Sequence, residues 1–268
     1  MSHPKIIWLF TLGLFIMSGC GHDPKDDPEP ERLVMVYFSA RPLSGSLLKS
    51  TASPDEVEIN KIILYGVDEH GAVVQTIRKL VESDPDPIPL SLSLNVETLY
   101  AIANADVNIE WATPTTVADL MNMTVNFSEA PQPPFLMSGI ATVDGGGSVN
   151  IELVRAIAKI DIFGLDTVED FQIESITVKN TAAKGYVFGS TESISIPTGI
   201  TDYVFPYAGE EVFSIYVAEN SEGCYPQFEV KFQDNDETYP FTLKSTGNEF
   251  DIVRNTCYQV SISFESEY

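Results

Sequence analysis

The residue types that most often carry catalysis are scarce in this chain. Its 268 residues include three histidines, His3, His22 and His70. A Ser-His-Asp triad needs a histidine beside a nucleophile, and an HExxH zinc site needs two histidines at fixed spacing. Neither pattern occurs, His70 stands in the turn-like run Asp68-Glu69-His70-Gly71, and the glycine-rich phosphate motifs are absent. We therefore expect no enzymatic activity, no cofactor and no metal site.

Two other groups of residues could bind a ligand. Asp234-Asn235-Asp236-Glu237 offers oxygen atoms that suit calcium, but it lacks the glycine and the spaced glutamate of an EF-hand loop. A solvated hairpin turn explains this run better. Trp111 could form a sugar-binding platform with tyrosines, but it closely follows an apolar segment, which favours a place in the core.

The charge balance excludes one large class of partners. Lys and Arg total 15 against 39 Asp and Glu, which gives a net charge of −24. A surface that binds nucleic acid needs basic groups that replace the counterions on phosphates, so we expect no nucleic-acid partner. Hydrophobic residues make up 44% of the chain, which is enough for a packed core and argues against global disorder.

The N-terminal segment has the composition of an export signal. Lys5 precedes an apolar run over residues 6–17, and Ser18-Gly19-Cys20 follows it. The run is about 12 residues long, too short to cross a bilayer core of about 30 Å. Its end resembles the lipobox of bacterial lipoproteins. The resemblance implies that residues 1–20 are a signal peptide with its lipidated Cys20, and an ordinary secretion signal with an incidental cysteine is the alternative.

Between this signal and the first apolar strand lies a linker. Residues 21–32 mix proline with acidic residues and should form an extended tether. Lipid, tether and folded domain in this order are typical of a surface-anchored protein. The two remaining cysteines, Cys224 and Cys257, could form a disulfide in an exported chain, although nothing in the sequence shows that they are close.

Beyond residue 32 the pattern of apolar runs predicts short strands separated by turn residues, which is typical of β-sandwiches. Alternating apolar residues at 57–67 and a return at 72–77 predict a hairpin around His70, and residues 117–121 after Thr115 or Thr116 predict one helix. Further strands are expected at 33–38, 90–94, 99–105, Ile157–Phe163, 173–178, 203–205, 212–217, 228–232 and 258–264. A glycine-rich break at 144–148 predicts domains at 33–148 and 149–268.

Five short motifs follow the tether in a fixed order. They are Leu99-Tyr100-Ala101-Ile102-Ala103-Asn104-Ala105, Phe135-Leu136-Met137-Ser138-Gly139, Arg155-Ala156-Ile157-Ala158-Lys159-Ile160-Asp161, Tyr216-Val217-Ala218-Glu219-Asn220 and Arg254-Asn255-Thr256-Cys257-Tyr258. Together with the lipobox and the tether they resemble the fimbrillin family of Bacteroidia, the type V pilins and their accessory subunits. The resemblance covers roughly residues 33–264. It implies an all-β fold of two tandem transthyretin-like β-sandwich domains, with one short helix in the N-terminal domain.

The same resemblance implies a structural subunit of a cell-surface pilus, of tip or accessory type, that is involved in adhesion. Such a subunit is exported as a lipoprotein and displayed on the outer membrane. A trypsin-like or arginine-specific protease then removes its first strand together with the lipid. The vacated groove accepts the C-terminal donor strand of a shaft subunit, so the expected partners are other pilin subunits and the final location is the fimbrium.

The residues after the tether are compatible with a removable strand. Leu33-Val34-Met35-Val36-Tyr37-Phe38-Ser39-Ala40 is apolar on both faces, as expected of a strand buried inside a sandwich. Arg41 follows in a loop-like run that a protease can reach, and Lys49 is the alternative cut because trypsin-like enzymes cleave Arg-Pro bonds poorly. Its removal would expose unpaired backbone groups that favour strand addition. An ordinary edge strand of a monomeric lipoprotein is the competing interpretation.

The C-terminal segment decides between roles within a pilus. Only ten residues follow Tyr258, too few to complete a strand and also donate one. A head-to-tail polymer stops where the donor is missing, so we expect an acceptor that stands at the tip. An uncleaved, lipidated anchor subunit is one alternative. A monomeric surface lipoprotein that binds a glycan or a host protein is the other.

Overall fold

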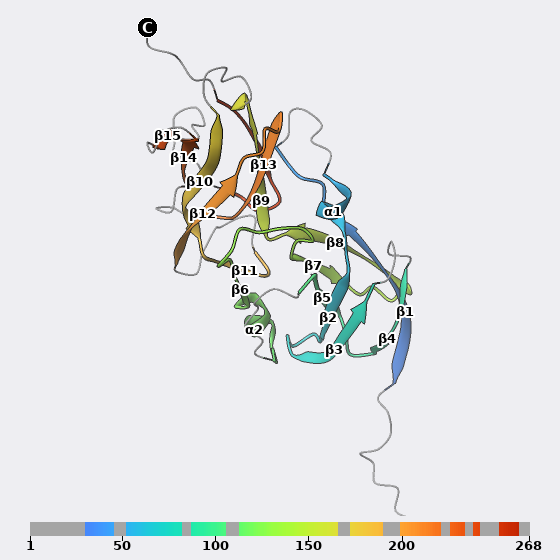
Figure 1. The fold of residues 1–268 in the computed structure, drawn as a ribbon. Helices are drawn as coiled ribbons and strands as arrows, with labels where there is room; N and C mark the ends of the chain where they lie inside the picture. The colour runs from blue at the N-terminus through green and yellow to red at the C-terminus, as the bar shows by residue number, and fades with distance from the viewer. Residues whose placement is uncertain are drawn as a thin grey trace, which may run out of the picture. The chain divides into compact units, whose positions relative to one another are not determined.

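The described part of the chain is built almost entirely of strands (Figure 1). The computed structural model describes residues 30–45, 52–81, 87–105, 113–165, 172–189, 199–220, 226–233, 238–241 and 252–262. Contacts gather Glu31–Tyr268 into one compact unit. Two short helices, α1 (Pro54–Val57) and α2 (Val117–Met121), accompany the strands. The predicted all-β class is confirmed, and α1 is an addition to the one helix predicted.

The first half of the chain forms a sheet that folds into two layers. Its order is β3 (Val73–Leu80), β2 (Lys61–Val67), β5 (Thr98–Ala103), β7 (Met137–Thr142), β8 (Ser148–Arg155), β1 (Glu31–Ala40) and β4 (Ile88–Ser93). Strand β8 joins the layers, because its last residues pair with β7 and its earlier residues pair with β1. Val34, Val36 and Ile151 of one layer share a hydrophobic cluster with Leu64 and Leu99 of the other.

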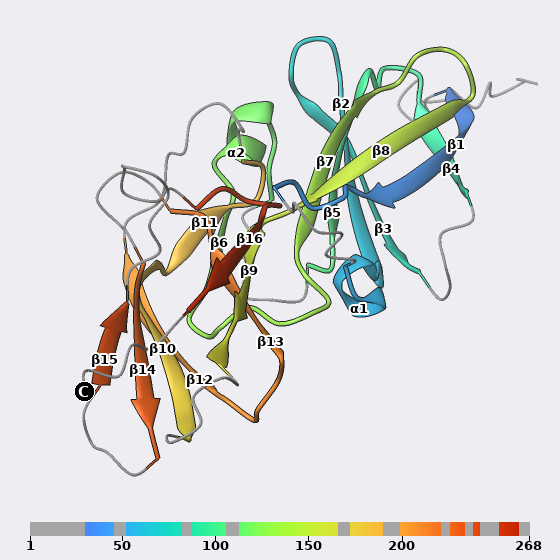
Figure 2. The ribbon, with the colours of Figure 1, turned by 90° about the horizontal axis from the view of Figure 1, so that it is seen from above.

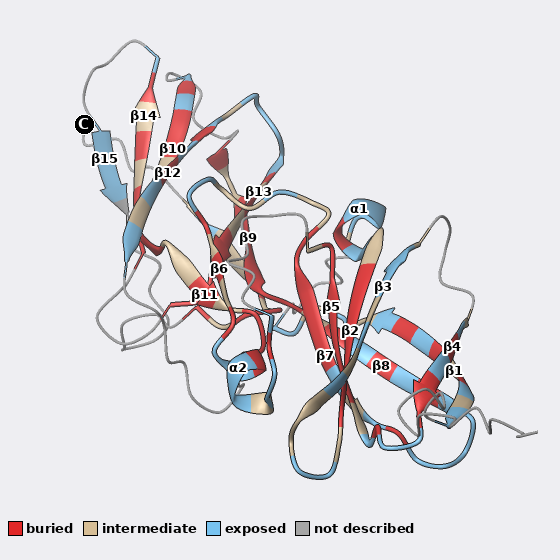
Figure 3. Cartoon of the chain, turned by 90° about the horizontal axis from the view of Figure 1, so that it is seen from below, coloured by how far each residue is buried: buried red, intermediate tan, exposed pale blue. Residues whose placement is uncertain are grey.

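Strands β2 and β5 are buried on both faces. The alternation of apolar residues over 57–67 predicted that only one face of β2 would be buried. Ile62 and Leu64 point into the cluster that contains β1, whereas Ile63 and Tyr65 belong to a second cluster that includes the C-terminal strands. Val57 lies in α1 instead of a strand and is exposed. Figure 3 shows the contrast between β2, buried along most of its length, and β1, buried at alternate residues.

The second half of the chain contributes two further sheets that enclose the second cluster. One has the order β12 (Ile200–Pro206), β10 (Ile173–Ala182), β14 (Gln227–Phe232) and β15 (Thr238–Phe241), and the other has β13 (Val212–Ala218), β9 (Ile157–Phe163) and β16 (Cys257–Ser261). Strand β16 runs parallel to β9, much as β1 runs parallel to β8 (Figure 2). Phe228, Val230, Ile160 and Ile215 are among the fully buried side chains between the sheets.

A small two-stranded sheet connects the two halves. Strand β6 (Thr124–Asn126) pairs with β11 (Lys184–Tyr186), and Tyr203 Oη donates a 2.7 Å hydrogen bond to the Phe127 carbonyl. Strand β8 begins at the predicted boundary but pairs with β1 and β7, so its residues complete the first sheet. The division into domains at 33–148 and 149–268 stays a prediction.

Local signals in the sequence located several elements correctly. Helix α2 has Thr116 as its N-cap, and Asp119 completes the capping box by accepting from backbone N–H groups. Hydrogen bonds from Thr115 and Thr116 lower the pKa of the Asp119 carboxyl. The predicted hairpin joins β2 to β3 through a turn in which Asp68 accepts from two backbone N–H groups. In the described ranges, neither helix is long and apolar enough to span a bilayer.

Candidate functional site

Strand β1 lies between two other strands of the first sheet. It pairs in antiparallel fashion with β4 from Glu31 to Val36 and in parallel with β8 from Met35 to Ala40. Its position between two partners contradicts the interpretation of residues 33–40 as an edge strand. The first strand of the described residues is therefore hydrogen-bonded to a neighbour on each side.

Only one face of β1 is buried, so the prediction of two apolar buried faces is wrong. Val34, Val36 and Phe38 are buried in the first cluster, whereas Leu33 and Tyr37 are 67% and 42% exposed. The reason is the two-layer sandwich, which covers one side of the β8-β1-β4 layer and leaves the other side open. Strand β1 therefore contributes alternate side chains to the core.

The chain after β1 is held in place by hydrogen bonds. Arg41 N–H donates to the Leu153 carbonyl at 2.8 Å, which continues the pairing with β8. Ser44 then forms a parallel bridge with Thr256: its N–H donates to the Asn255 carbonyl, and its own carbonyl accepts from Cys257 N–H at 2.8 Å. The predicted protease-accessible run thus begins with four residues that cross from β8 to the start of β16.

A buried pair, Arg155 and Asn255, binds this crossing segment. Arg155 Nη1 donates to the Arg41 carbonyl at 2.8 Å, and Asn255 Nδ2 donates to the Pro42 carbonyl at 2.9 Å. The two side chains also contact each other, since Arg155 Nη1 lies 2.8 Å from Asn255 Oδ1. Arg155 Nε donates to the Glu56 carbonyl at 2.9 Å, so one guanidinium binds both ends of the segment 41–56. The Arg41 side chain is half exposed and pairs with Glu152 at 3.4 Å.

Next to Arg155 lies a buried cluster of ionisable groups. Glu56 of α1 accepts at Oε1 from Lys159 Nζ at 2.9 Å and from Tyr216 Oη at 2.8 Å. Asp161 lies 3.6 Å from Lys159 Nζ and 3.4 Å from the buried Cys257 Sγ. Among the described residues, Glu56 Oε2 and Arg155 Nη2 have no hydrogen-bond partner.

Burial and these contacts shift the pKa values of three members of the group. Burial alone would lower the pKa of Lys159, but the hydrogen bond with Glu56 and the charge of Asp161 outweigh it, and the pKa is raised. Burial, together with Glu56, raises the pKa of Tyr216. Burial lowers the pKa of Arg155. The cluster therefore holds Lys159 protonated and Tyr216 neutral, which suits a structural network better than a proton-transfer site.

A second buried arginine stands one residue before Asn255. Arg254 donates from Nε and Nη2 to the two carboxylate oxygens of Glu219, at 2.8 Å for Nε. It also donates to the backbone carbonyls of Tyr186, the last residue of β11, and of Val187, the residue after it. Gly189 makes room for this guanidinium, because a Cβ there would lie 2.0 Å from Arg254 Cζ. Arg254 therefore links the turn before β16 to Glu219 at the end of β13 and to the end of β11.

The five motifs that carry the family resemblance converge on these contacts. Arg155 and Lys159 come from the third motif, Tyr216 and Glu219 from the fourth, and Arg254 and Asn255 from the fifth. The first two motifs meet where Asn104 donates to the Phe135 carbonyl at 2.9 Å, and Ser138 donates to the Val187 carbonyl at 2.7 Å. Sequence reasoning assigned these residues no role. Charged residues inside apolar strands were the signal that could have found them.

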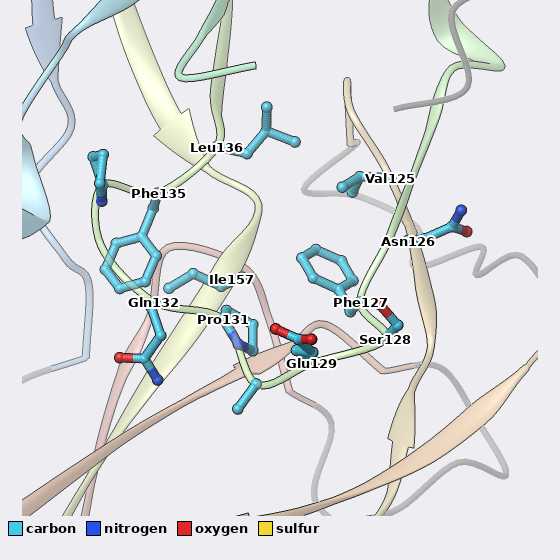
Figure 4. Close-up of a pocket in the computed structure, with 12 residues that line it drawn as sticks. Val125, Asn126, Phe127, Ser128, Glu129, Pro131, Gln132, Phe135, Leu136 and Ile157 are labelled. Atoms are coloured by element: carbon cyan, nitrogen blue, oxygen red, sulfur yellow. The ribbon is translucent and has the colours of Figure 1, made fainter. Parts of the chain in front are cut away.

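A separate cavity of about 250 Å³ opens beside β6 (Figure 4). Its wall is mainly apolar, with the rings of Phe127 and Phe135 on either side of Ile157 and Pro131, and Glu129 at its margin. None of the residues predicted to carry function lines it. Within the described ranges, no three His, Cys, Asp or Glu side chains come together in a way that could hold a metal ion.

Several predicted sites lie outside the described residues. They are the lipidation site Cys20, the alternative cut site Lys49, the cysteine Cys224, the aromatic Trp111 and the acidic run at 234–237. Cys257 is buried at the start of β16, and its pairing with Cys224 stays a prediction. His70 is exposed at the β2–β3 turn.

No family model and no curated protein matches the sequence. Solved structures do match it. The tip fimbrial protein Mfa3 from Porphyromonas gingivalis aligns with a TM-score of 0.60 at 13% identity, over 88% of this chain and 97% of that one.

Two other solved structures give the same result. A candidate cell adhesion protein from Bacteroides eggerthii aligns with a TM-score of 0.58 at 16% identity, over 88% of this chain and 86% of that one. A fimbrial assembly protein from Parabacteroides distasonis aligns with a TM-score of 0.55 at 13% identity, over 87% and 91%. The resemblance to fimbrillin-like proteins is thus confirmed at the level of the fold.

Proposed function

We propose that this protein is a structural subunit of a cell-surface pilus that accepts a donor strand from a neighbouring subunit after losing β1. The observation that carries the proposal is the position of β1, which lies between β4 and β8 and supplies core side chains although it is the first strand. The similarity of the whole chain in fold to fimbrial and adhesion proteins supports the same assignment.

The energetics favour replacement of β1 over simple loss. Val34, Val36 and Phe38 are each less than 10% exposed. Burying such a side chain contributes about 1.5–3 kcal/mol, so an empty slot would cost much of the stability of a domain. It would also leave the facing edges of β4 and β8 without partners, which is the arrangement that binds an added strand. A donor strand would restore both contributions.

The contacts around Arg41 bear on where processing occurs. The Arg41 carbonyl would be the scissile group of a cut at Arg41, and it accepts from the buried Arg155. A protease must bind its substrate in an extended form, so this bond has to break first. Cleavage at Lys49 avoids that cost, and we propose it over Arg41. The cut piece would also contain the whole segment that occupies the slot.

The finer parts of the proposal concern location and role. Cys20 is the proposed lipid attachment site, which places the precursor on the outer membrane and the processed subunit in the fimbrium. A Cys20→Ala variant should lose labelled fatty acid and leave the membrane fraction. Within the pilus we propose a tip or accessory position, in keeping with the shared fold of a tip fimbrial protein.

The test of the proposal is limited proteolysis of the purified precursor with a trypsin-like enzyme. Mass spectrometry then identifies the new N-terminus, and melting is measured with and without a peptide from the C-terminus of a shaft subunit. We expect a cut at Lys49 in preference to Arg41 and a rise in Tm that depends on the peptide, because a ligand of the folded state stabilises it. A cut protein from which β1 has been separated, and which keeps its full Tm without peptide, would contradict strand exchange.

A second candidate function rests on the same contacts. Because β1 is paired on both sides and its following segment is bound by Arg155 and Asn255, the strand could remain in place permanently. The protein would then be an uncleaved anchor subunit or a monomeric surface lipoprotein that binds a glycan or host protein. An N-terminal lipidated Cys20 on the mature surface protein would favour this candidate.

A further inference from the structure

We propose that Arg155 and Asn255 form a carbonyl latch that holds the end of any strand in the β1 slot and sets the length that strand must have. For β1 itself the inference stands on the contacts described above. For an incoming strand it rests on the proposed function. The two positioning residues come from β8 and from the turn before β16, so they meet only in the folded chain.

The latch recognises backbone, because its two partners are consecutive main-chain oxygens. Arg155 Nη1 binds the Arg41 carbonyl and Asn255 Nδ2 binds the next carbonyl, that of Pro42. Both latch side chains are at most 4% exposed, and the bond between them fixes their orientation. Asn255 adopts a φ of 55°, a conformation that asparagine tolerates better than most residues.

The positions of these carbonyls set the length and direction of the occupant. The residue pairs of β1 and β8 end at Ala40, Arg41 N–H adds one last bond to β8, and the two bound carbonyls belong to Arg41 and Pro42. A strand that ended at the Ala40 position would leave two buried donors without acceptors, which is unfavourable. A strand in the antiparallel direction would place its N-terminal end, not its C-terminal end, beside Arg155 and Asn255. The slot therefore accepts a strand that runs parallel to β8 and extends at least two residues beyond the paired region.

Every residue carries a backbone carbonyl, so the latch does not discriminate between strands of different sequence. Side-chain preference comes from the core positions of Val34, Val36 and Phe38. The latch also acts after processing, because a cut between Arg41 and Glu56 leaves the Arg41 and Pro42 carbonyls bound. Cleavage and strand release are then separate events, and release requires the latch to open.

The first test uses the full chain and two matched asparagine variants. Asn255→Asp keeps the Oδ1 that accepts from Arg155 but loses the donor to Pro42. Asn104→Asp is the control, because Asn104 is equally buried, has a φ of 57°, and also donates to backbone carbonyls, those of Glu58 and Phe135, which lie outside β1 and the segment after it.

Hydrogen exchange of the β1 amides is measured against that of the β5 amides in each protein. We expect Asn255→Asp to speed β1 exchange about tenfold relative to β5, which corresponds to the loss of one buried hydrogen bond. Asn104→Asp should leave the ratio near that of the unmodified protein. An equal ratio in both variants would overturn the latch.

The second test asks whether the latch also binds the two carbonyls at the end of an incoming strand. Protein treated with a lysine-specific protease is mixed with two labelled, amidated peptides, one covering residues 31–40 and one covering residues 31–44. The longer peptide should bind about tenfold more tightly, and this preference should fall in Asn255→Asp but not in Asn104→Asp. Equal binding of both peptides to the unmodified protein would overturn the length rule. If neither peptide enters while the exchange difference persists, strand exchange fails and the latch on native β1 stands.

Discussion

The two buried arginines differ in what they bind. Arg254 faces a carboxylate, and both oxygens of Glu219 accept from its guanidinium. Arg155 donates to the carbonyls of Arg41 and Glu56 and to the Asn255 amide oxygen, and one of its nitrogens has no partner among the described residues. The two side chains are 3% and 1% exposed, so burial alone does not distinguish them.

The partners decide what each arginine can do. A buried guanidinium paired with a fixed carboxylate cannot be released without leaving an uncompensated charge, so the Arg254–Glu219 pair is a permanent joint. Backbone carbonyls are neutral and can be supplied by another chain. Arg155 can therefore release the carbonyl of one strand and bind that of another at a smaller energetic cost than separation of Arg254 from Glu219. It lies at the end of β1, the strand for which exchange is proposed.

The largest effect is expected from Arg254→Met. It leaves the Glu219 carboxylate buried without its cation and should lower the free energy of unfolding by about 3–5 kcal/mol, as measured by chemical denaturation. A double variant, Arg254→Met with Glu219→Gln, should recover part of this loss because the buried charge is gone. A loss below about 1 kcal/mol in the single variant would show that the joint is not a stabilising pair.

Gly189→Ala probes the same joint from its other side. The new Cβ would lie 2.0 Å from Arg254 Cζ, and the ion pair prevents the guanidinium from moving away freely. We expect a loss of about 1–3 kcal/mol in unfolding free energy. Gly146→Ala is the control, because no atom lies within 4 Å of a Cβ there, and it should be close to neutral. Equal stabilities of the two variants would argue against tight packing at Gly189.

Arg155→Met should cost less than Arg254→Met, which is the direct test of the comparison. It leaves no carboxylate that was paired with the guanidinium alone, because Glu56 Oε1 keeps Lys159 and Tyr216. The carbonyls of Arg41 and Glu56 lose a donor, and we expect a loss of about 1–2 kcal/mol by chemical denaturation. A loss of unfolding free energy equal to that of Arg254→Met would contradict the proposed difference between the Arg254–Glu219 pair and the latch.

The smallest effect is a pH dependence at Lys159. Its folded pKa lies above its ordinary value of 10.5, so its contribution to stability is complete below that value and is lost as the pH rises through the folded pKa. The destabilisation caused by Lys159→Met should therefore stay constant up to about pH 10 and shrink as the pH rises above that value. Burial raises the pKa of Tyr216 and that of Tyr203, the latter to about 12, so both tyrosines stay largely neutral up to about pH 11. A difference that stays constant with pH would contradict the ion pair with Glu56.

Much of the fold follows from local patterns that the sequence displays directly. The capping box of Thr116 and Asp119, the turn at Asp68 and the strand Ile157–Phe163 depend on neighbouring residues, so propensity and hydrogen-bond chemistry were enough to locate them. The all-β class follows from the same alternation of short apolar runs and turn residues. The lipidation of Cys20 is likewise a sequence prediction.

The functional site depends on contacts between residues far apart in the chain, which only the tertiary structure brings together. Arg155 and Asn255 are 100 residues apart, and Asn255 and Pro42 are 213 apart. Local pattern could not show that β1 would be buried on one face, because that depends on which layers cover it. Nor could it show why Glu56 is buried in a four-residue helix, since Lys159 and Tyr216 of other strands provide its partners. A buried charge is stable only where the fold supplies its hydrogen bonds, and that supply is a property of the whole structure.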